Sequence, residues 1–303
     1  MTTLSPRVGI SALEGAADLS DFAAILDRAE ALGVDTIELP TYEQDLVVGG
    51  RVRRSQLEKL RAICAGRAVA YTVHGPLAIN FLDEPFRLAR HYEVLQASVE
   101  AAAELGAVHY VMHAGNMPMS QHDGMEAAYA RQREWLHKAG ELGRQHGMLI
   151  CVETLFVDDA ARFHTATPSR LAREIKAIAH PFLRGTLDFS HSAINLTYSG
   201  GDLVQECAAL TPYCNHLHIH DSFGRIDDIW MYTTGERVAY GHGDLHLPVG
   251  WGDIPWDALL RDCVFPPGVI FNIELNPRFW YAAEECVAAT RALAGKARIA
   301  TWG

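Results

Sequence analysis

Short apolar runs rich in β-branched residues recur along the whole chain, and longer amphipathic stretches separate them. The runs are RVGIS (7–11), VDTIEL (34–39), AVAYTVH (68–74), AVHYVMH (107–113), MLICVE (148–153), LRGTLD (183–188), HLHIH (216–220) and VIFNIE (269–274). Strands that alternate with helices form parallel sheets, because each helix carries the chain back to the edge where the next strand starts. This alternation constrains the fold more than any other feature of the sequence.

The stretches between these runs have the periodicity of helices with one apolar face. From Phe22 to Leu32, apolar residues recur three or four positions apart, and Gly33 ends the pattern. Similar stretches cover 55–66, 87–106, 124–147, 167–180 and 254–263, another follows Trp280, and a weaker one lies around 201–212. Eight strand–helix units in 303 residues predict an α/β fold, a closed (β/α)8 TIM barrel. No GxGxxG motif follows the first run, which removes the usual dinucleotide-binding alternative.

The barrel is expected to account for residues 1–303 as a single domain, because no linker or low-complexity segment interrupts the pattern. One departure is a long loop insertion at about 221–253, which is rich in Gly, Asp, Trp and Tyr and lacks helical periodicity. Loops of this length in compact domains are usually functional or disordered. Its aromatic residues Trp230, Tyr232 and Tyr240 are expected to form a lid over a small molecule.

Charge and composition argue against several classes of protein. The chain has 26 Lys and Arg against 37 Asp and Glu, a net charge of −11, which disfavours nucleic acid as a partner. No run approaches about 18 apolar residues and the start lacks a signal-peptide pattern, so we expect no membrane contact and a cytoplasmic location. The 6 cysteines form no CxxC pair and are expected to be buried free thiols. The sequence leaves open whether the chain forms a homo-oligomer.

The informative residues are polar side chains that end seven of the eight expected strands. They are Glu38, His74, His113, Glu153, Asp188, His218 or His220, and Glu274. In a barrel of parallel strands these ends share one rim, where barrel enzymes build their active sites. Crowded carboxylates repel one another unless a cation binds them, so the ring predicts a metal site. Imidazole mixed with carboxylate suits zinc, manganese or iron better than magnesium or calcium.

Local patterns add candidates near the same rim. DFSH places Asp188 three residues before His191, and GDLH places Asp244 two residues before His246. In HLHIH the histidines alternate onto one side of the strand at different depths, so His216, the deepest, is expected to support ligands rather than bind metal. No HExxH, P-loop or GxSxG motif is present.

Taken together, these residues resemble the xylose isomerase-like TIM-barrel superfamily, which includes sugar isomerases, sugar epimerases and endonuclease IV. The resemblance extends from VHGPLAINF (73–81) to IELNPRFW (273–280). The epimerase branch implies four metal ligands in this chain, which are Glu153, Asp188, His218 and Glu274. It also implies that the two glutamates move protons, and that His191 and Arg225 contact the substrate. His74 and His220 are further candidates for substrate contact.

Endonuclease IV resembles the chain at more positions. Its three-zinc site implies nine ligands, namely His74, His113, Glu153, Asp188, His191, His218, Asp244, His246 and Glu274. Two departures argue against DNA as the substrate. The loop PTYEQDLVVGG (40–50) is acidic and glycine-rich where that enzyme presents a basic DNA-inserting residue, and Leu77 stands where that enzyme has an aromatic residue.

The leading hypothesis is a divalent-metal-dependent isomerase or epimerase that acts on a small sugar, polyol or sugar phosphate through an enediolate. Glu153 and Glu274 form the expected acid/base pair, and His191 or Arg225 would stabilise the developing oxyanion. One to three zinc or manganese ions are compatible with the ligand set. The surplus ligands favour a second hypothesis, a multinuclear zinc phosphoesterase. A lyase or dehydratase that uses the same site is a third.

Overall fold

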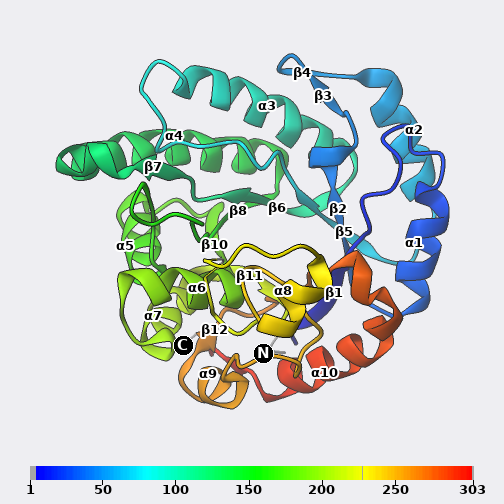
Figure 1. Cartoon of the computed structure of the whole chain (residues 1–303). Helices are drawn as coiled ribbons and strands as arrows, with labels where there is room; N and C mark the ends of the chain where they lie inside the picture. Colours follow the sequence, from blue (N-terminus) through cyan, green and yellow to red (C-terminus); the bar gives the residue numbers. More distant parts are fainter. Residues whose placement is uncertain (1–4, 227, 302–303) are drawn as a thin grey trace.

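The computed structural model describes residues 5–226 and 228–301. Eight parallel strands close into a barrel in the order β1-β13-β11-β10-β8-β6-β5-β2, and helices surround it (Figure 1). The strands are β1 (Arg7–Ser11), β2 (Thr36–Pro40), β5 (Ala70–His74), β6 (Ala107–His113), β8 (Leu149–Glu153), β10 (Leu183–Asp188), β11 (Cys214–Ile219) and β13 (Ile270–Ile273). The predicted (β/α)8 barrel is confirmed.

The predicted helical stretches are also present on the outside of the barrel. They correspond to α1 (Phe22–Ala31), α2 (Arg54–Cys64), α3 (Leu88–Glu104), α4 (Met125–His146), α5 (Pro168–Ile178), α7 (Leu203–Leu210), α9 (Trp256–Asp262) and α10 (Ala283–Lys296). Pro168 occupies the first turn of α5, where its missing N–H leaves no hydrogen bond unmade. No described helix is long and apolar enough to cross a membrane.

One helix at the barrel mouth was not predicted. Helix α6 (Phe189–Ser199) starts directly after β10, and the Asp188 side chain caps it by accepting a hydrogen bond from the His191 backbone N–H at 2.7 Å. Its buried face includes Ser190, Ser192 and Asn195. Because these buried residues are polar, the apolar periodicity that marks an amphipathic helix is absent from the sequence.

The insertion after β11 also contains a helix, contrary to the sequence analysis. Helix α8 (Thr234–Tyr240) begins with a capping box formed by Thr233 and Glu236, and Gly241 ends it in a left-handed conformation. Seven residues make about two turns, which is too short for periodicity to stand out. The capping residues were the available signal for this helix.

Small elements complete the chain outside the barrel. Three two-stranded pairs join β3 (Val47–Val48) to β4 (Arg51–Val52), β7 (Asn116–Pro118) to β9 (Phe163–Thr165), and β12 (Val264–Phe265) to β14 (Arg298–Ile299). Short 3-10 helices are η1 (Thr41–Glu43), η2 (Met119–Gly124), η3 (Thr211–Tyr213) and η4 (Pro277–Ala282). All six cysteines are free and buried, as expected.

The barrel has two chemically different surfaces. Outward-facing strand residues such as Ile37, Leu217 and Phe271 are apolar and fully or almost fully buried in the layer between the strands and the helices. Several positions on the other side of the strands are polar and equally buried, among them Thr72 and Asn272. Buried polar groups need partners, so the inside of the barrel is expected to be a hydrogen-bonded network rather than an apolar plug.

Candidate metal centre

The ends of four strands bring Glu153, Asp188, His218 and Glu274 together. One ligand atom from each lies within 4.8 Å of the corresponding atoms of the others. Strand register explains this proximity, because Asp188 is the direct neighbour of His218 across the β10–β11 pair. His218 Nδ1 lies 3.1 Å from Glu153 Oε1, 3.3 Å from Glu274 Oε2 and 3.9 Å from Asp188 Oδ2. A single imidazole nitrogen therefore faces three carboxylates.

The electrostatics of this first group depend on close contact between opposite charges. Burial alone would raise the pKa of the Glu153 carboxyl, but the imidazoles of His218, His191 and His74 bring that pKa well below its usual range. Burial would lower the pKa of His218, and the surrounding glutamates raise it well above its usual value. The group thus favours ionised carboxylates around a positive centre. A divalent cation bound among these residues would neutralise the same carboxylates, with shorter contacts to their oxygens and to the imidazole nitrogen.

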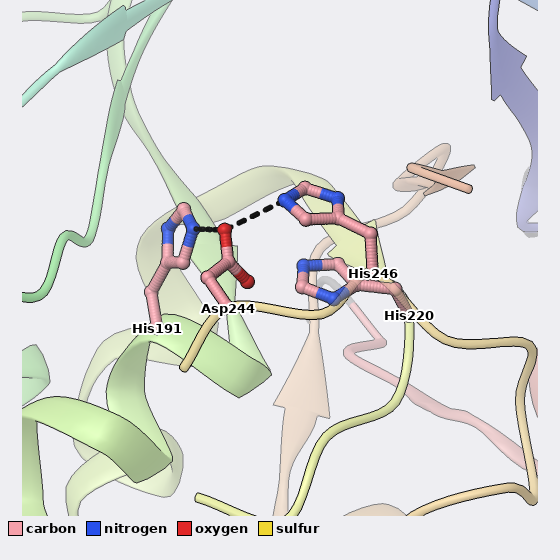
Figure 2. A group of neighbouring side chains, drawn as sticks. All are labelled: His191, His220, Asp244 and His246. Carbon is pink, nitrogen blue, oxygen red and sulfur yellow. Dashed lines mark hydrogen bonds and ion pairs between the residues drawn. The ribbon is translucent and has the colours of Figure 1, made fainter. Parts of the chain in front are cut away.

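A second group lies beside the first and consists of His191, His220, Asp244 and His246 (Figure 2). Asp244 Oδ2 lies 3.2 Å from His191 Nε2 and 2.7 Å from His246 Nε2. Its other oxygen, Oδ1, is buried and has no hydrogen-bond partner among the described residues. Burial lowers the pKa of His246, but Asp244 outweighs that effect and raises it to about 9.

The orientation of three rim histidines is fixed by the backbone. The Nδ1 atoms of His74, His191 and His246 lie 3.1, 3.0 and 3.0 Å from the carbonyl oxygens of Gly75, Thr154 and Glu274. If each Nδ1–H donates to its carbonyl, each Nε2 is directed at a carboxylate in the cavity. Metal-binding histidines are usually held in this way by their second nitrogen. The donor chemistry of the rim therefore fits one or more zinc or manganese ions.

Glu153 connects the first group to a third one. Its Oε2 lies 3.1 Å from His74 Nε2 and 3.7 Å from His113 Nε2, whereas its Oε1 faces His218. Burial is the main cause that lowers the pKa of His113 to about 4, so its imidazole is neutral and able to donate a lone pair. His113 pairs with Glu153 in the β6–β8 register, which accounts for their proximity.

Asp221, to which the sequence analysis gave no role, holds the loop that carries the second group. Its side chain accepts hydrogen bonds from the N–H groups of Gly250 at 2.8 Å and Ile254 at 3.2 Å, and from Trp256 Nε1 at 3.2 Å. Its backbone pairs with Leu247. The signal in the sequence was an acidic residue directly after the histidine-rich strand end HLHIH.

A cavity of about 380 Å³ opens above these groups. Seven of the predicted site residues line it, namely His74, His113, Glu153, His191, Asp244, His246 and Glu274. Asp188 and His218 lie below its surface and are fully buried. A smaller cavity of about 210 Å³ shares Tyr42, His246 and Glu274 with the first, so the mouth of the barrel has two lobes.

Two expected substrate contacts occupy other positions. Arg225 does not line either lobe, and its Nη1 donates a hydrogen bond of 2.8 Å to the Tyr240 carbonyl within the insertion. His220 is fully buried behind His246. The lid aromatics Trp230 and Tyr232 are 74% and 79% exposed and contact each other rather than the residues of the cavity.

Glu38 was expected to end its strand at the rim, and this expectation is wrong. Strand β2 continues to Pro40, so Glu38 lies in the middle of the strand, paired with Thr72 inside the barrel. Its carboxylate lies 3.1 Å from His216 Nε2 and 3.3 Å from His218 Nε2. His216 is fully buried at this lower level, where Glu38, His216 and His218 form a fourth group of possible ligands, so the supporting role expected for His216 stays a prediction.

The comparisons with known proteins agree with this architecture. The family model described as "Xylose isomerase-like TIM barrel" matches residues 26–275. No curated protein matches the chain. A solved D-tagatose 3-epimerase-like protein shares 18% identity with a TM-score of 0.71, covering 96% of this chain and 98% of its own.

Two further structures show the same similarity. D-psicose 3-epimerase from Clostridium cellulolyticum, solved with D-tagatose, shares 14% identity with a TM-score of 0.66, covering 95% of this chain and 99% of its own. A protein from Thermus thermophilus, soaked with ZnCl2, shares 20% identity with a TM-score of 0.64, covering 96% and 99%. At these identities the likeness establishes a common fold.

Proposed function

We propose that this chain, which belongs to the xylose isomerase-like TIM-barrel family, is a divalent-metal-dependent isomerase or epimerase of a small sugar, polyol or sugar phosphate. One observation carries the proposal: Glu153 and Glu274 both face Nδ1 of His218 at the floor of the cavity, at 3.1 and 3.3 Å. The sugar epimerases among the structurally similar proteins support the choice of substrate class.

Glu153, Asp188, His218 and Glu274 would hold the metal ion, and zinc or manganese suits three carboxylates with one imidazole. A bound ion acts as a Lewis acid toward a carbonyl and its neighbouring hydroxyl group. Asp188 is fully buried, so its part is to bind and orient rather than to contact the sugar. His218 is equally buried, whereas Glu153 and Glu274 line the cavity, where they can reach the substrate carbon that exchanges its proton.

The proton transfer falls to the two glutamates. One carboxylate removes the proton from the carbon next to the carbonyl, and the other returns a proton after the enediolate has formed. Both residues line the cavity, and His74 Nε2 lies 3.1 Å from Glu153 Oε2, where it can hold a proton between the two steps. His191 lies at the same cavity wall, where a protonated imidazole would stabilise the negative charge of the enediolate oxygen.

The experiment that tests this proposal measures proton exchange with solvent. Protein loaded with manganese or zinc is incubated in deuterated water with a panel of ketoses and ketose phosphates. We expect deuterium at the carbon next to the carbonyl in at least one sugar, together with its epimer or isomer. Absence of exchange across the panel, in protein that demonstrably holds metal, would contradict the proposal.

The second group of ligands favours one alternative, a multinuclear zinc phosphoesterase. His191 and His246 both direct Nε2 at Asp244 Oδ2, which forms a further set of donors beside the first. Several ions could clamp a phosphate group and supply hydroxide. Three tightly held zinc ions per chain, with phosphate released from sugar phosphates and no deuterium exchange, would favour this function instead.

A further inference from the structure

His220 differs from the histidines that line the cavity at the barrel mouth. Like His218, it is fully buried and lines neither lobe of the cavity. Its Nε2 makes a hydrogen bond of 2.8 Å to Asp188 Oδ2. Its ring stacks on that of His246 (Figure 2), and the ring centroids are 4.0 Å apart with planes 6° from parallel. One side chain therefore touches a residue of the first ligand group and a residue of the second.

The same geometry argues against His220 as a metal ligand. An imidazole binds a metal through a lone pair that lies in the plane of its ring. Since the rings of His220 and His246 are parallel and stacked, their in-plane lone pairs do not converge on one ion. Its Nε2 is also engaged by Asp188. His220 belongs to the second group because it lies close to the other three residues, but the orientation of its ring argues that it does not bind the ion itself.

The hydrogen bond to Asp188 completes the support of that carboxylate. Asp188 Oδ1 accepts a hydrogen bond of 2.7 Å from the His191 backbone N–H, and Oδ2 receives the one from His220. Both oxygens are thus held before any ion binds. The ring of His220 also supports the second group, because its stacking contact fixes the plane of the His246 ring, from which Nε2 faces Asp244.

We infer that His220 is a positioning residue that couples the two ligand groups, through its hydrogen bond to Asp188 and its stacking contact with His246. This inference rests on the proposed metal-dependent function. Residues behind metal ligands orient them before the ion arrives, and their loss typically lowers metal affinity by about 10- to 100-fold. The two contacts therefore predict two separable losses of metal affinity, one in each ligand group.

Two substitutions separate these contacts. His220→Phe keeps an aromatic ring against His246 but removes the donor to Asp188, so the affinity of the ion held by the first group is expected to fall about 10- to 100-fold. His220→Gln keeps a donor that can reach Asp188 but removes the ring, so the second group is expected to lose affinity while the first retains it. Both are measured by titrating metal-free protein with cobalt against a chelator, following the visible absorption of each bound ion.

A matched control is available outside the mouth of the barrel. His180 is also buried, makes a hydrogen bond of 2.9 Å to the carboxylate of Glu141, and contacts the ring of His137 at 5.2 Å. His180→Phe removes an equivalent hydrogen bond far from the ligand groups and is expected to leave both affinities unchanged. Unfolding temperatures of all variants in chelator separate weakened metal binding from general instability.

The outcomes distinguish this inference from the proposed function. Wild-type protein that binds no divalent ion would overturn the proposed function. Wild-type protein that binds ions with the same affinities as His220→Phe and His220→Gln would overturn the role of His220 alone. If His220→Phe does not fold, the pattern in His220→Gln still decides, because loss of affinity in both groups or in neither contradicts the assignment.

Discussion

The mouth of the barrel and the layer below it both combine carboxylates with imidazoles, yet they differ in how the charges are satisfied. In the lower layer, Glu38 accepts hydrogen bonds from Ser11 Oγ at 3.1 Å, Thr72 Oγ1 at 3.2 Å and Asn272 Nδ2 at 3.1 Å, in addition to its contacts with imidazoles. At the mouth, Asp244 contacts imidazoles through Oδ2, and its Oδ1 has no partner among the described residues.

The difference shows what distinguishes a structural polar network from a candidate binding site. A carboxylate that accepts several hydrogen bonds from neutral donors, as Glu38 does besides its contacts with imidazoles, is already partly solvated by the protein and gains less from an added ion. A carboxylate whose partners are imidazoles can still be stabilised by an added ion, because those imidazoles can exchange a proton for a metal. Both layers contain carboxylates and imidazoles, and the other neighbours of each carboxylate decide its role.

The largest expected effect tests the proton-transfer role at the mouth. Glu274→Gln keeps the shape of the side chain but removes the base, so activity on a verified substrate should fall by about 10²- to 10⁴-fold. The measurement is kcat together with the metal content of the same sample. Retained metal with unchanged kcat would remove Glu274 from the proton transfer.

Glu38→Gln tests the lower layer. It leaves the imidazole of His218, whose pKa the surrounding glutamates raise, without one of its charged partners, 3.3 Å away, and turns an acceptor into an amide donor that faces other donors. Breaking a buried charge pair of this kind costs about 3 kcal/mol of unfolding free energy. We expect this loss in denaturant unfolding with the number of bound ions unchanged. A lost ion at full stability would show that the two layers are not distinct.

Asp244→Asn is the matching change at the mouth. It removes a carboxylate shared by two imidazoles, so affinity in the second group should fall at least about tenfold, the loss typical even for residues behind the ligands. Because Asp244 raises the pKa of His246 to about 9, the substitution also breaks a buried charge pair, so the unfolding free energy in chelator should fall. Unchanged affinity in the second group would contradict the comparison.

The smallest effect concerns thiols far from either layer. Burial raises the pKa of Cys64 and of Cys263 to about 11, so both are neutral thiols at pH 8. All six cysteines are buried, and native protein is expected to react with a disulfide reagent at none of them, whereas unfolded protein reacts at all six. A rapidly reacting thiol in native protein would reveal local opening.

Much of the fold could be predicted because it depends on local patterns. The run RVGIS became β1 (Arg7–Ser11) and AVHYVMH became β6 (Ala107–His113) without any shift of boundary. Helix α6 escaped prediction because the face it buries carries the polar residues Ser190 and Ser192, so its buried positions are not marked by apolar residues.

The sequence by itself determined which side chains reach the mouth, because alternation along a strand and the shared direction of parallel strands are local rules. Tertiary structure alone decided how deep each one lies. Glu38 was placed inside the barrel, His220 behind His246, and Asp221 under the loop of the second group. Depth depends on the tilt and stagger of all eight strands together, and no single segment contains that information.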